Sequence, residues 1–285
     1  MKHISILALV VVVVLIGSAL ADPVQTDHKT VPLDDADAVL ALVDFGAGSI
    51  DVHPGPSGSL LDATMTYDPE FVDVFLDYRH RRGRGILELA SDFDEKRLTR
   101  RIKNEWDVGL SSEVPMELEL DIGAAEAQID LSGLSITRLE LDVGAADCEV
   151  WWDKANGSTM TELSIDCGAS SLLIEGLGYA GLEYLDFEGG LGSFELDFSG
   201  DWQASAEGHL EVGLGQLEIT VPRSIGVRIE ATESFGSVDV DRWFDEVDRD
   251  VYESENYADA KIKLLLEIEL GMGSLDVRST TRDRP

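Results

Sequence analysis

Positive charge is scarce in this chain: 22 Lys and Arg residues stand against 56 Asp and Glu residues, giving a formal net charge of −34. Contacts to phosphates need a basic face, so this balance disfavours nucleic-acid binding. Hydrophobic residues make up 44% of the chain, which is too many for a disordered acidic tail. The acids must therefore lie on the outside of a folded body, which suits a salty milieu, a cation-rich surface or simple solubility.

Cysteine is nearly absent as well. Only Cys148 and Cys167 are present, which is too few for a disulfide scaffold, and no Cys-x-x-Cys or Cys/His cluster predicts zinc. Both occupy apolar positions of a local alternating pattern. We therefore expect small buried core residues, with a disulfide between the two as the alternative.

Signals for catalysis are also missing. The five histidines are scattered, and acids occur so widely that no carboxylate pair stands out. No EF-hand loop is present, and the Gly-x-Gly-Ser phrases at 190–193 and 271–274 do not open helices as phosphate loops do. The sequence predicts a protein that is not an enzyme and has no cofactor, although polysaccharide-cleaving enzymes built on β-helices remain an alternative.

Long apolar runs are confined to the N-terminus. Lys2 and His3 precede an apolar run from Ile4 to Ile16, and Ala19-Leu20-Ala21 forms a small-residue cleavage signal before Asp22. This arrangement predicts a secretory signal peptide over residues 1–21, with an uncleaved anchor as the alternative. We expect a secreted or periplasmic (extracytoplasmic) bacterial protein with no membrane span after cleavage.

What the chain has in abundance is one repeated phrase, in which a carboxylate and an apolar residue precede a glycine, a small-residue turn and a second alternating run. Two copies read LDIGAAEAQIDL from Leu120 and LDVGAADCEV from Leu141. The key small residues are Gly46, Gly123, Gly144, Gly168, Gly190, Gly213, Gly271 and, in one degenerate copy, Ser234. From Gly123 to Ser234 the steps are 21, 24, 22, 23 and 21 residues, which suits one coil of a β-solenoid.

These patterns predict an all-β fold, a single-stranded β-solenoid of stacked coils of 21–24 residues. The coils are expected to be right-handed because parallel crossovers favour that hand. The key glycines should form tight corners, which often need a positive φ, and should line up along one edge. Small residues and Met are expected to fill these corners because they are crowded.

The expected organisation is a signal peptide over 1–21, a polar, poorly ordered leader over 22–36, and a smaller irregular N-terminal β region over 37–112. The β-solenoid follows over 113–278, with a frayed tail over 279–285. Strands are expected at 61–67, 72–78 and 86–90, and a short helix near 92–103. Residues 241–261 interrupt the repeats and predict a flap or short helix that covers an open part of the stack.

A local basic island lies at residues 79–103, which hold nine of the 22 Lys and Arg residues. It could dock an anionic polymer or lipid, or it could form salt bridges with acids of the same chain.

The run from Asn104 to Val150 resembles the toast-rack domain of bacterial exported proteins, a group related to the putative-adhesin β-solenoids and to the C-terminal domain of LiaF-type envelope-stress proteins. The resemblance covers most of residues 37–278, with Trp106, Pro115 and the Asn256-Tyr257 loop as further markers. It implies a stacked β-solenoid at the cell envelope and supplies no catalytic motif. LiaF-type proteins carry transmembrane helices before this domain, whereas this chain has only the signal-like leader.

The repeat places carboxylates at two fixed positions that alternate with apolar residues and so face outward. Two residues before the key glycine stand Asp44, Asp121, Asp142, Asp166, Glu188, Glu211 and Glu269, with Thr232 in the degenerate copy. Five residues after it stand Asp51, Glu149, Glu195, Glu218, Asp239 and Asp276. If successive repeats are neighbouring coils, equivalent acids lie about 4.8 Å apart.

Like charges at that spacing repel by roughly 1 kcal/mol even at the dielectric of water. The column therefore needs screening salt, bound divalent cations or interleaved Lys and Arg, and the last are few. We expect a weak cation ladder at Asp121, Asp142, Asp166, Glu188 and Glu211. A solvated acidic face whose carboxylates fan apart, or a dedicated calcium cage, are the alternatives.

Together these observations predict an exported cell-envelope protein that acts as an adhesin or scaffold, with an unknown envelope protein or surface polymer as its partner. An envelope-stress signalling domain and a carbohydrate-active enzyme are the rival hypotheses. The enzyme would need a concave groove that holds a carboxylate pair and aromatic platforms.

Overall fold

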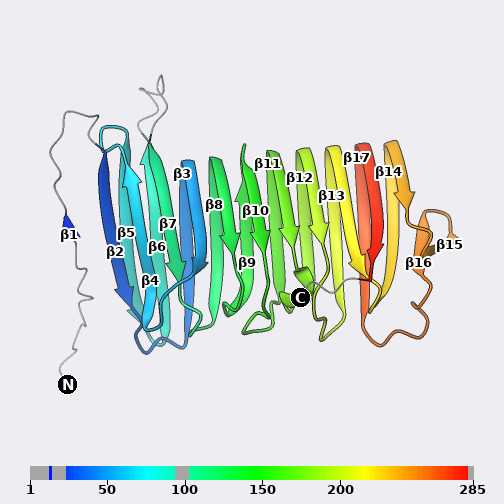
Figure 1. Cartoon of the computed structure of the whole chain (residues 1–285), viewed down its shortest axis with the longest axis horizontal. Helices are drawn as coiled ribbons and strands as arrows, with labels where there is room; N and C mark the ends of the chain where they lie inside the picture. The colour runs from blue at the N-terminus through cyan, green and yellow to red at the C-terminus, as the bar shows by residue number, and fades with distance from the viewer. Residues whose placement is uncertain (1–12, 15–23, 94–102, 282–285) are drawn as a thin grey trace.

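The computed structural model describes residues 13–14, 24–93 and 103–281 and is built from strands, with one short 3-10 turn, η2 (Leu177–Tyr179). The all-β prediction is confirmed (Figure 1). The strands of the N-terminal part are β1 (Val13–Val14), β2 (Gln25–Pro32), β3 (Ala38–Pro54), β4 (Ser59–Tyr67), β5 (Val72–Arg81), β6 (Arg84–Phe93) and β7 (Asn104–Leu110). The others are β8 (Met116–Asp130), β9 (Ile136–Val143), β10 (Asp147–Trp151), β11 (Glu162–Glu175), β12 (Tyr184–Asp197), β13 (Ala206–Pro222), β14 (Gly226–Val240), β15 (Phe244–Asp248), β16 (Val251–Ser254) and β17 (Lys263–Thr280).

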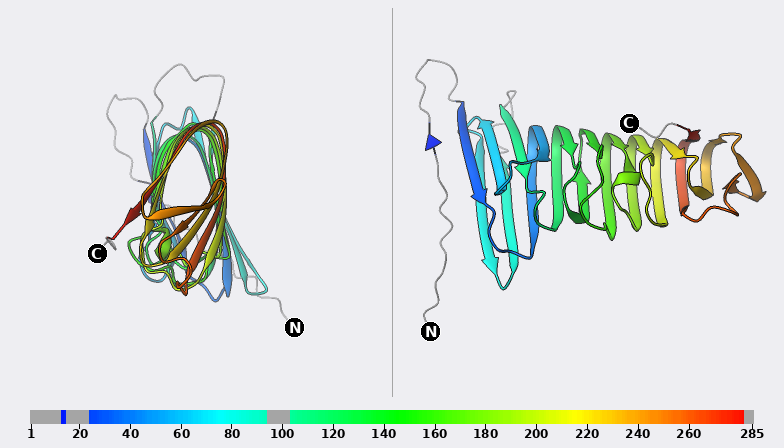
Figure 2. Two further views of the ribbon diagram at one scale, coloured as in Figure 1. Left: turned by 90° about the vertical axis from the view of Figure 1, so that its right-hand side faces the viewer. Right: turned by 60° about the horizontal axis from the view of Figure 1, so that its bottom comes forward.

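Parallel strands form one long stack in the order β3, β8, the pair β9 and β10, β11, β12, β13, β17 and β14. Most of these strands pass through a key glycine, so that each contributes its first half to one side of the stack and its second half to the other. Seen along the stack, the strands curve around a flattened interior (Figure 2).

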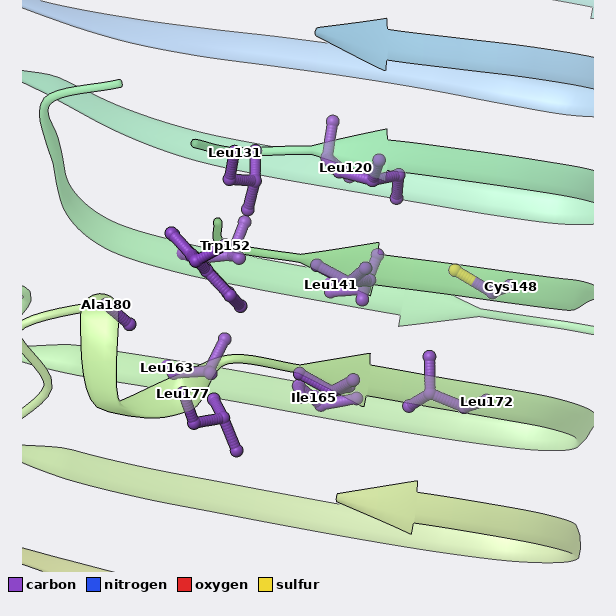
Figure 3. Close-up of a cluster of buried hydrophobic side chains, with 14 of the residues drawn as sticks. Leu120, Leu131, Leu141, Cys148, Trp152, Leu163, Ile165, Leu172, Leu177 and Ala180 are labelled. Atoms are coloured by element: carbon purple, nitrogen blue, oxygen red, sulfur yellow. The ribbon is translucent and has the colours of Figure 1, made fainter. Parts of the chain in front are cut away.

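The interior is filled by the alternate residues of every strand, as the period of two predicts. In β12, Leu185, Phe187, Phe194 and Leu196 are buried, whereas Glu188 and Glu195 are exposed. Because the same positions recur in neighbouring strands, apolar side chains stack into a continuous core (Figure 3). Each strand therefore buries its apolar face against its neighbours in the stack.

The key glycines line up in one column, as expected, but for a reason other than the one predicted. A Cβ on Gly123, Gly144, Gly168, Gly190, Gly213 or Gly271 would lie 2.2 to 2.9 Å from the carbonyl oxygen of the preceding glycine in the column. None of these six, nor Gly46, has a positive φ. Close backbone approach between strands, rather than a left-handed conformation, therefore excludes a side chain here.

The positive φ falls two residues later in some copies, at Gly48 (φ 128°) and Gly273 (φ 144°). A Cβ on Gly273 would also meet the carbonyl oxygen of Gly215 at 1.7 Å. The corner thus has two positions at which a side chain would clash with the neighbouring strand. The sequence pattern identified only the first of them, the key glycine.

The order of the stack departs from chain order at its C-terminal end. β17 lies between β13 and β14 and pairs in parallel with both, so that Gly271 follows Gly213 in the column and Ser234 comes last. The degenerate copy is therefore the outermost strand. The expectation that successive repeats are neighbours holds from β3 to β13 and for β14 with β17, and it fails between β13 and β14, which β17 separates.

Residues 241–261 form a flap rather than a helix. β15 and β16 make an antiparallel hairpin, and β16 pairs with the first half of β14 through Arg228 and Glu253. Trp243 and Phe244 are buried at its base, with ring centroids 5.2 Å apart in an edge-to-face arrangement. The hairpin covers part of the end of the stack.

The other end carries antiparallel strands. The two halves of β3 pair in parallel with β6 and β7, and the antiparallel strands add to these, β5 to β6 and β4 to β7. β2 lies within the predicted polar leader yet pairs antiparallel with β4, and its buried Asp27 accepts a hydrogen bond from Tyr67 Oη at 3.0 Å. The expected strands at 61–67, 72–78 and 86–90 are found in β4, β5 and β6.

Some expectations lie wholly or partly outside the described residues. Most of the predicted signal peptide falls there. So do residues 94–102 of the expected short helix, whose first two residues, Asp92 and Phe93, instead end strand β6. Ser279 and Thr280, expected in the frayed tail, end β17 and pair with Val221 and Pro222 of β13, while 282–285 lie outside the description. Among the described residues, no helix has the length and apolar character needed to cross a bilayer.

Candidate functional site: a carboxylate column along the stack

Seven carboxylates lie side by side in strict register along the outer face of the stack. The pairs are Asp44 with Asp121, Asp121 with Asp142, Asp142 with Asp166, Asp166 with Glu188, Glu188 with Glu211, and Glu211 with Glu269. All seven are exposed, and Thr232 of β14 ends the row. We call this row the carboxylate column. It includes the five residues predicted as a cation ladder, spaced by about 4.8 Å, the ordinary distance between paired strands.

A second row of acids runs beside the column on the same face, two residues earlier in each strand. Its acids are Glu119, Glu140, Asp186, Glu267 and Glu230, with Ser164 and His209 between them. Negative charge therefore extends in two dimensions over this face, and the field at its centre is stronger than one column alone would produce.

The acids crowd most closely between β3, β8 and β9. A shallow depression of about 180 Å³ is lined there by Asp44, Glu119, Asp121, Glu140 and Asp142. Partial burial raises the pKa of Asp142, and so does the charge of Glu140, Asp121 and Asp166. Partial burial likewise raises the pKa of Asp44, with Asp121 and Asp92 as further causes. At neutral pH this part of the column holds repelling charges without full hydration.

The basic side chains near the column form ion pairs with other acids. Arg138 contacts Glu140 and Glu162 at 3.5 and 3.1 Å, and Arg228 contacts Glu230 and Glu253 at 2.9 and 2.6 Å, so both lie in the flanking rows. Within residues 24–93 and 103–281, none of the seven column carboxylates forms an ion pair. Of the three ways to relieve the repulsion, salt screening and bound cations are the two that remain.

The column is not a cage for one ion. The described residues offer only one cluster in which three ligand atoms lie within 4.8 Å of one another, formed by Asp34, Asp35 and His80. In that cluster His80 Nδ1 lies 2.9 Å from Asp34 Oδ2, and Asp35 is 96% exposed, so an ion pair explains it. Cations at the column would be shared between neighbouring strands and held weakly.

The second predicted column, five residues after the glycine, is interrupted. Its register order is Asp51, Gln128, Glu149, Leu173, Glu195, Glu218, Asp276 and Asp239. Only the last four acids are contiguous, and Arg278 contacts Glu218 at 3.3 Å and also Asp276. Gln128 and Leu173 occupy the same position in their repeats, so this side lacks a continuous row.

Both cysteines are buried, as predicted, with 1% of each residue exposed. They are free thiols, and Figure 3 shows Cys148 in the same interior as Leu141 and Leu172. Burial raises the pKa of Cys148 to about 12 and that of Cys167 to about 11. The thiolate, which is the reactive form, is therefore suppressed at neutral pH.

The basic island pairs with acids of the same chain in its described part. Arg84 contacts Glu117 at 2.9 Å, Arg79 contacts Asp77 and Glu88, and Lys103 contacts Glu105. These contacts favour the salt-bridge interpretation of the island over a docking site.

A cleft of about 440 Å³ lies between β3, β4, β7 and β8. It is lined by the acids Asp51, Glu105, Asp107 and Glu126 and by Thr64 and Thr66. Strands distant in sequence meet here, so no local motif could reveal it. Its tryptophan, Trp106, is only 3% exposed and packs edge-to-face on Phe45. Among the described lining residues there is thus no aromatic platform, which a sugar-cleaving groove would need.

An apolar row along the corner was also missed. The residues that follow the key glycines include Leu191, Leu214, Met272 and Phe235, which pair in that order and are 52%, 48%, 52% and 75% exposed. We call them the corner row. Met272 was expected to fill a crowded corner, but its side chain points to solvent. The change from Ala at 47, 124, 145 and 169 to larger residues was the available signal.

The family model for the N-terminal domain of toast_rack matches residues 20–152 and again 151–220. No curated protein is similar enough in sequence to match the chain.

Solved structures similar to this chain include a putative cell adhesion protein from Clostridium sporogenes, at 19% identity and a TM-score of 0.49 over 90% of this chain and all of that one. A putative adhesin from Bacteroides fragilis has 10% identity and a TM-score of 0.43 over 93% of this chain and all of that one. A putative lipid binding protein from Parabacteroides distasonis has 11% identity and a TM-score of 0.33 over 90% and 96%. Likeness at this level carries no inference about function.

Proposed function

This chain belongs to the toast-rack family, and from that premise we propose that it is an exported, non-enzymatic envelope protein that binds a surface through its carboxylate column. The observation that carries the proposal is a row of seven exposed acids, in register and without ion pairs among the described residues. Such a row repeats charge at the spacing of the strands, so it suits a polymer or surface with many weak contacts rather than one small ligand.

In this proposal, divalent cations screen the column and bridge it to other anionic groups, while a cationic polymer contacts it directly. The depression at Asp44, Asp121 and Asp142 is the preferred cation position, because partial burial there makes ionised acids most costly. The coils wind right-handed with 21–24 residues each, since parallel crossovers favour that hand. The leader over residues 1–21 directs export.

Adsorption of the purified protein to polymer films tests the binding role. We expect it to bind a poly-lysine film directly and a carboxylated film only when calcium or magnesium is added. Asp121→Asn, Asp142→Asn and Asp166→Asn together should weaken both. The matched control is Glu126→Gln, Asp147→Asn and Glu149→Gln, which removes three charges from the other side of the stack. Equal weakening by the two triple variants would contradict a role for the column.

Cell fractionation tests export separately. The full chain should be found outside the cytoplasm, and a chain lacking residues 1–21 should stay inside. Cytoplasmic retention of the full chain would exclude the envelope role, whatever the films show.

A further inference from the structure

The outermost strand of the stack leaves half of its edge unpaired. β14 pairs with β17 from Gly226 to Val240 on one side, but on the other side β16 contacts only Arg228–Glu230. No described residue pairs with the outer edge from Thr232 to Val240, although β14 is the last long strand of the stack and the hairpin of β15 and β16 lies outside it (Figures 1 and 2). Alternate backbone N–H and C=O groups of this segment are therefore free to pair with a further strand.

The core below this edge is also incompletely covered. Val238 and Val240 are in register with Leu275 and Val277 of β17, which are each 1% exposed, yet they themselves are only half-buried. Phe235 is 75% exposed and ends the corner row, next to Met272. One added strand would cover the two valines and shield one side of the phenylalanine, which is the usual gain from stacking another coil.

Charge selects which strand could bind. Glu233 takes the register position of Leu270 and is exposed, and Asp239 points outward on the same segment. The neighbouring hairpin adds the exposed acids Asp245, Glu246, Asp248 and Asp250. A second copy of this chain, with its net charge of −34, would be repelled, because charges placed on an edge strand act against self-pairing.

We propose that the outer edge of β14, from Thr232 to Val240, binds an extended segment of a partner protein by β-strand addition, and that this segment alternates apolar residues with lysine or arginine. Its apolar residues cover Val238 and Val240 and pack on Phe235. Its basic residues face Asp239 and the acids of the hairpin. Backbone pairing supplies affinity, and the alternating side chains supply selectivity. This edge adjoins the end of the carboxylate column at Thr232 but contains none of its seven acids.

The test uses the purified chain and a fluorescent nine-residue peptide that alternates valine and lysine, with a scrambled peptide of the same composition as control. Phe235→Ser with Asp239→Lys alters the edge. Leu191→Ser with Glu195→Lys makes the same kind of change at the same two register columns in the middle of the stack. Thermal melts of both variants check that they fold.

We expect the edge variant to bind the peptide about tenfold more weakly than the unaltered chain, as for loss of an aromatic anchor and reversal of a charge. The mid-stack variant should bind within about twofold, since its changes lie away from the edge. Hydrogen exchange should slow at 232–240 when the peptide is bound. Equal weakening in both variants, or protection along the carboxylate column instead, would overturn the proposal. So would a dimer of the free chain that Phe235→Ser dissociates, because a second copy would then occupy the edge.

Discussion

At the scale of single residues, backbone packing decides what the corner tolerates. A Cβ on Gly123 would lie only 2.2 Å from the carbonyl oxygen of Gly46, so the fold excludes any side chain at this position. Glycine was identified there from the repeat alone. The physical cause could not be read from one repeat, because it is contact between two strands 77 positions apart in the chain.

Gly123→Ala should lower the free energy of unfolding by about 1–3 kcal/mol, the usual cost of forcing atoms into a packed site. Denaturant unfolding measures it, with Ala124→Ser as a control because Ala124 is exposed at the same corner. The control should change stability by no more than about 0.5 kcal/mol. If the two variants were equally stable, the contact with Gly46 would not restrict this position.

Cys148 and Cys167 should not react with a thiol reagent in the native protein at neutral pH. Burial hides both sulfur atoms and raises their pKa to about 12 and about 11, so the reactive thiolate is rare. Labelling should proceed only after denaturant unfolds the chain. Rapid labelling of either sulfur in the folded protein would show that the interior is open to the reagent.

The pKa of Asp142 is raised above its usual 3.8, first by partial burial and then by neighbouring carboxylates. A raised folded pKa means that the folded state holds its proton more tightly than the unfolded chain, so this residue lowers stability as pH rises through the folded value. Asp142→Asn should therefore raise the melting temperature at pH 7 and flatten its pH dependence at acidic pH. Glu149→Gln is the control on the other side of the stack. A lower melting temperature at pH 7 for Asp142→Asn alone would contradict this.

At the scale of elements, strands in the stack depend on their neighbours more than on their place in the sequence. The order β13, β17, β14 could not be predicted, because the 57 residues between Gly213 and Gly271 carry no mark of where the last strand pairs. The degenerate copy at Ser234 was the available hint, since the second half of β14 has a paired neighbour, among the described residues, on one side only. The predicted flap was correct in place, and its hairpin form follows from pairing with β14.

Trp243→Ala should loosen the end of the stack without unfolding all of it. Trp243 is 5% exposed, packs against Phe244 and lies 5.5 Å from the Arg223 guanidinium. Its removal should cost about 3 kcal/mol locally. Hydrogen exchange should accelerate in β14 and β17 and change little in β8–β10, because each strand of the stack pairs only with its neighbours.

Tyr184→Ala is the control for that variant, since Tyr184 is 39% exposed on β12. It should leave exchange in β14 and β17 unchanged. Uniform acceleration across the whole chain in Trp243→Ala would show that the stack unfolds as one unit.

At the scale of the whole molecule, the repeat determines the acidic face. The fixed position of each acid relative to its key glycine became strict register in space, so the carboxylate column could be predicted residue by residue. The gaps of the second column at Gln128 and Leu173 are also visible in the sequence, whereas the contact of Arg278 with Glu218 appears only once the strands are stacked. The corner row and the open edge of β14 were missed because they emerge only when strands are stacked.

The most direct test of the account is thermal unfolding of the full chain at pH 7 against salt. Folding brings the column acids closer together than in the unfolded chain, so their repulsion opposes the native state. Sodium chloride should raise the melting temperature by screening, and calcium or magnesium should raise it more per mole by binding the folded form. Asp121→Asn, Asp142→Asn and Asp166→Asn together should melt higher at low salt and respond less to either salt. A melting temperature indifferent to both kinds of salt would contradict the account, because the column would then be only a well-hydrated surface.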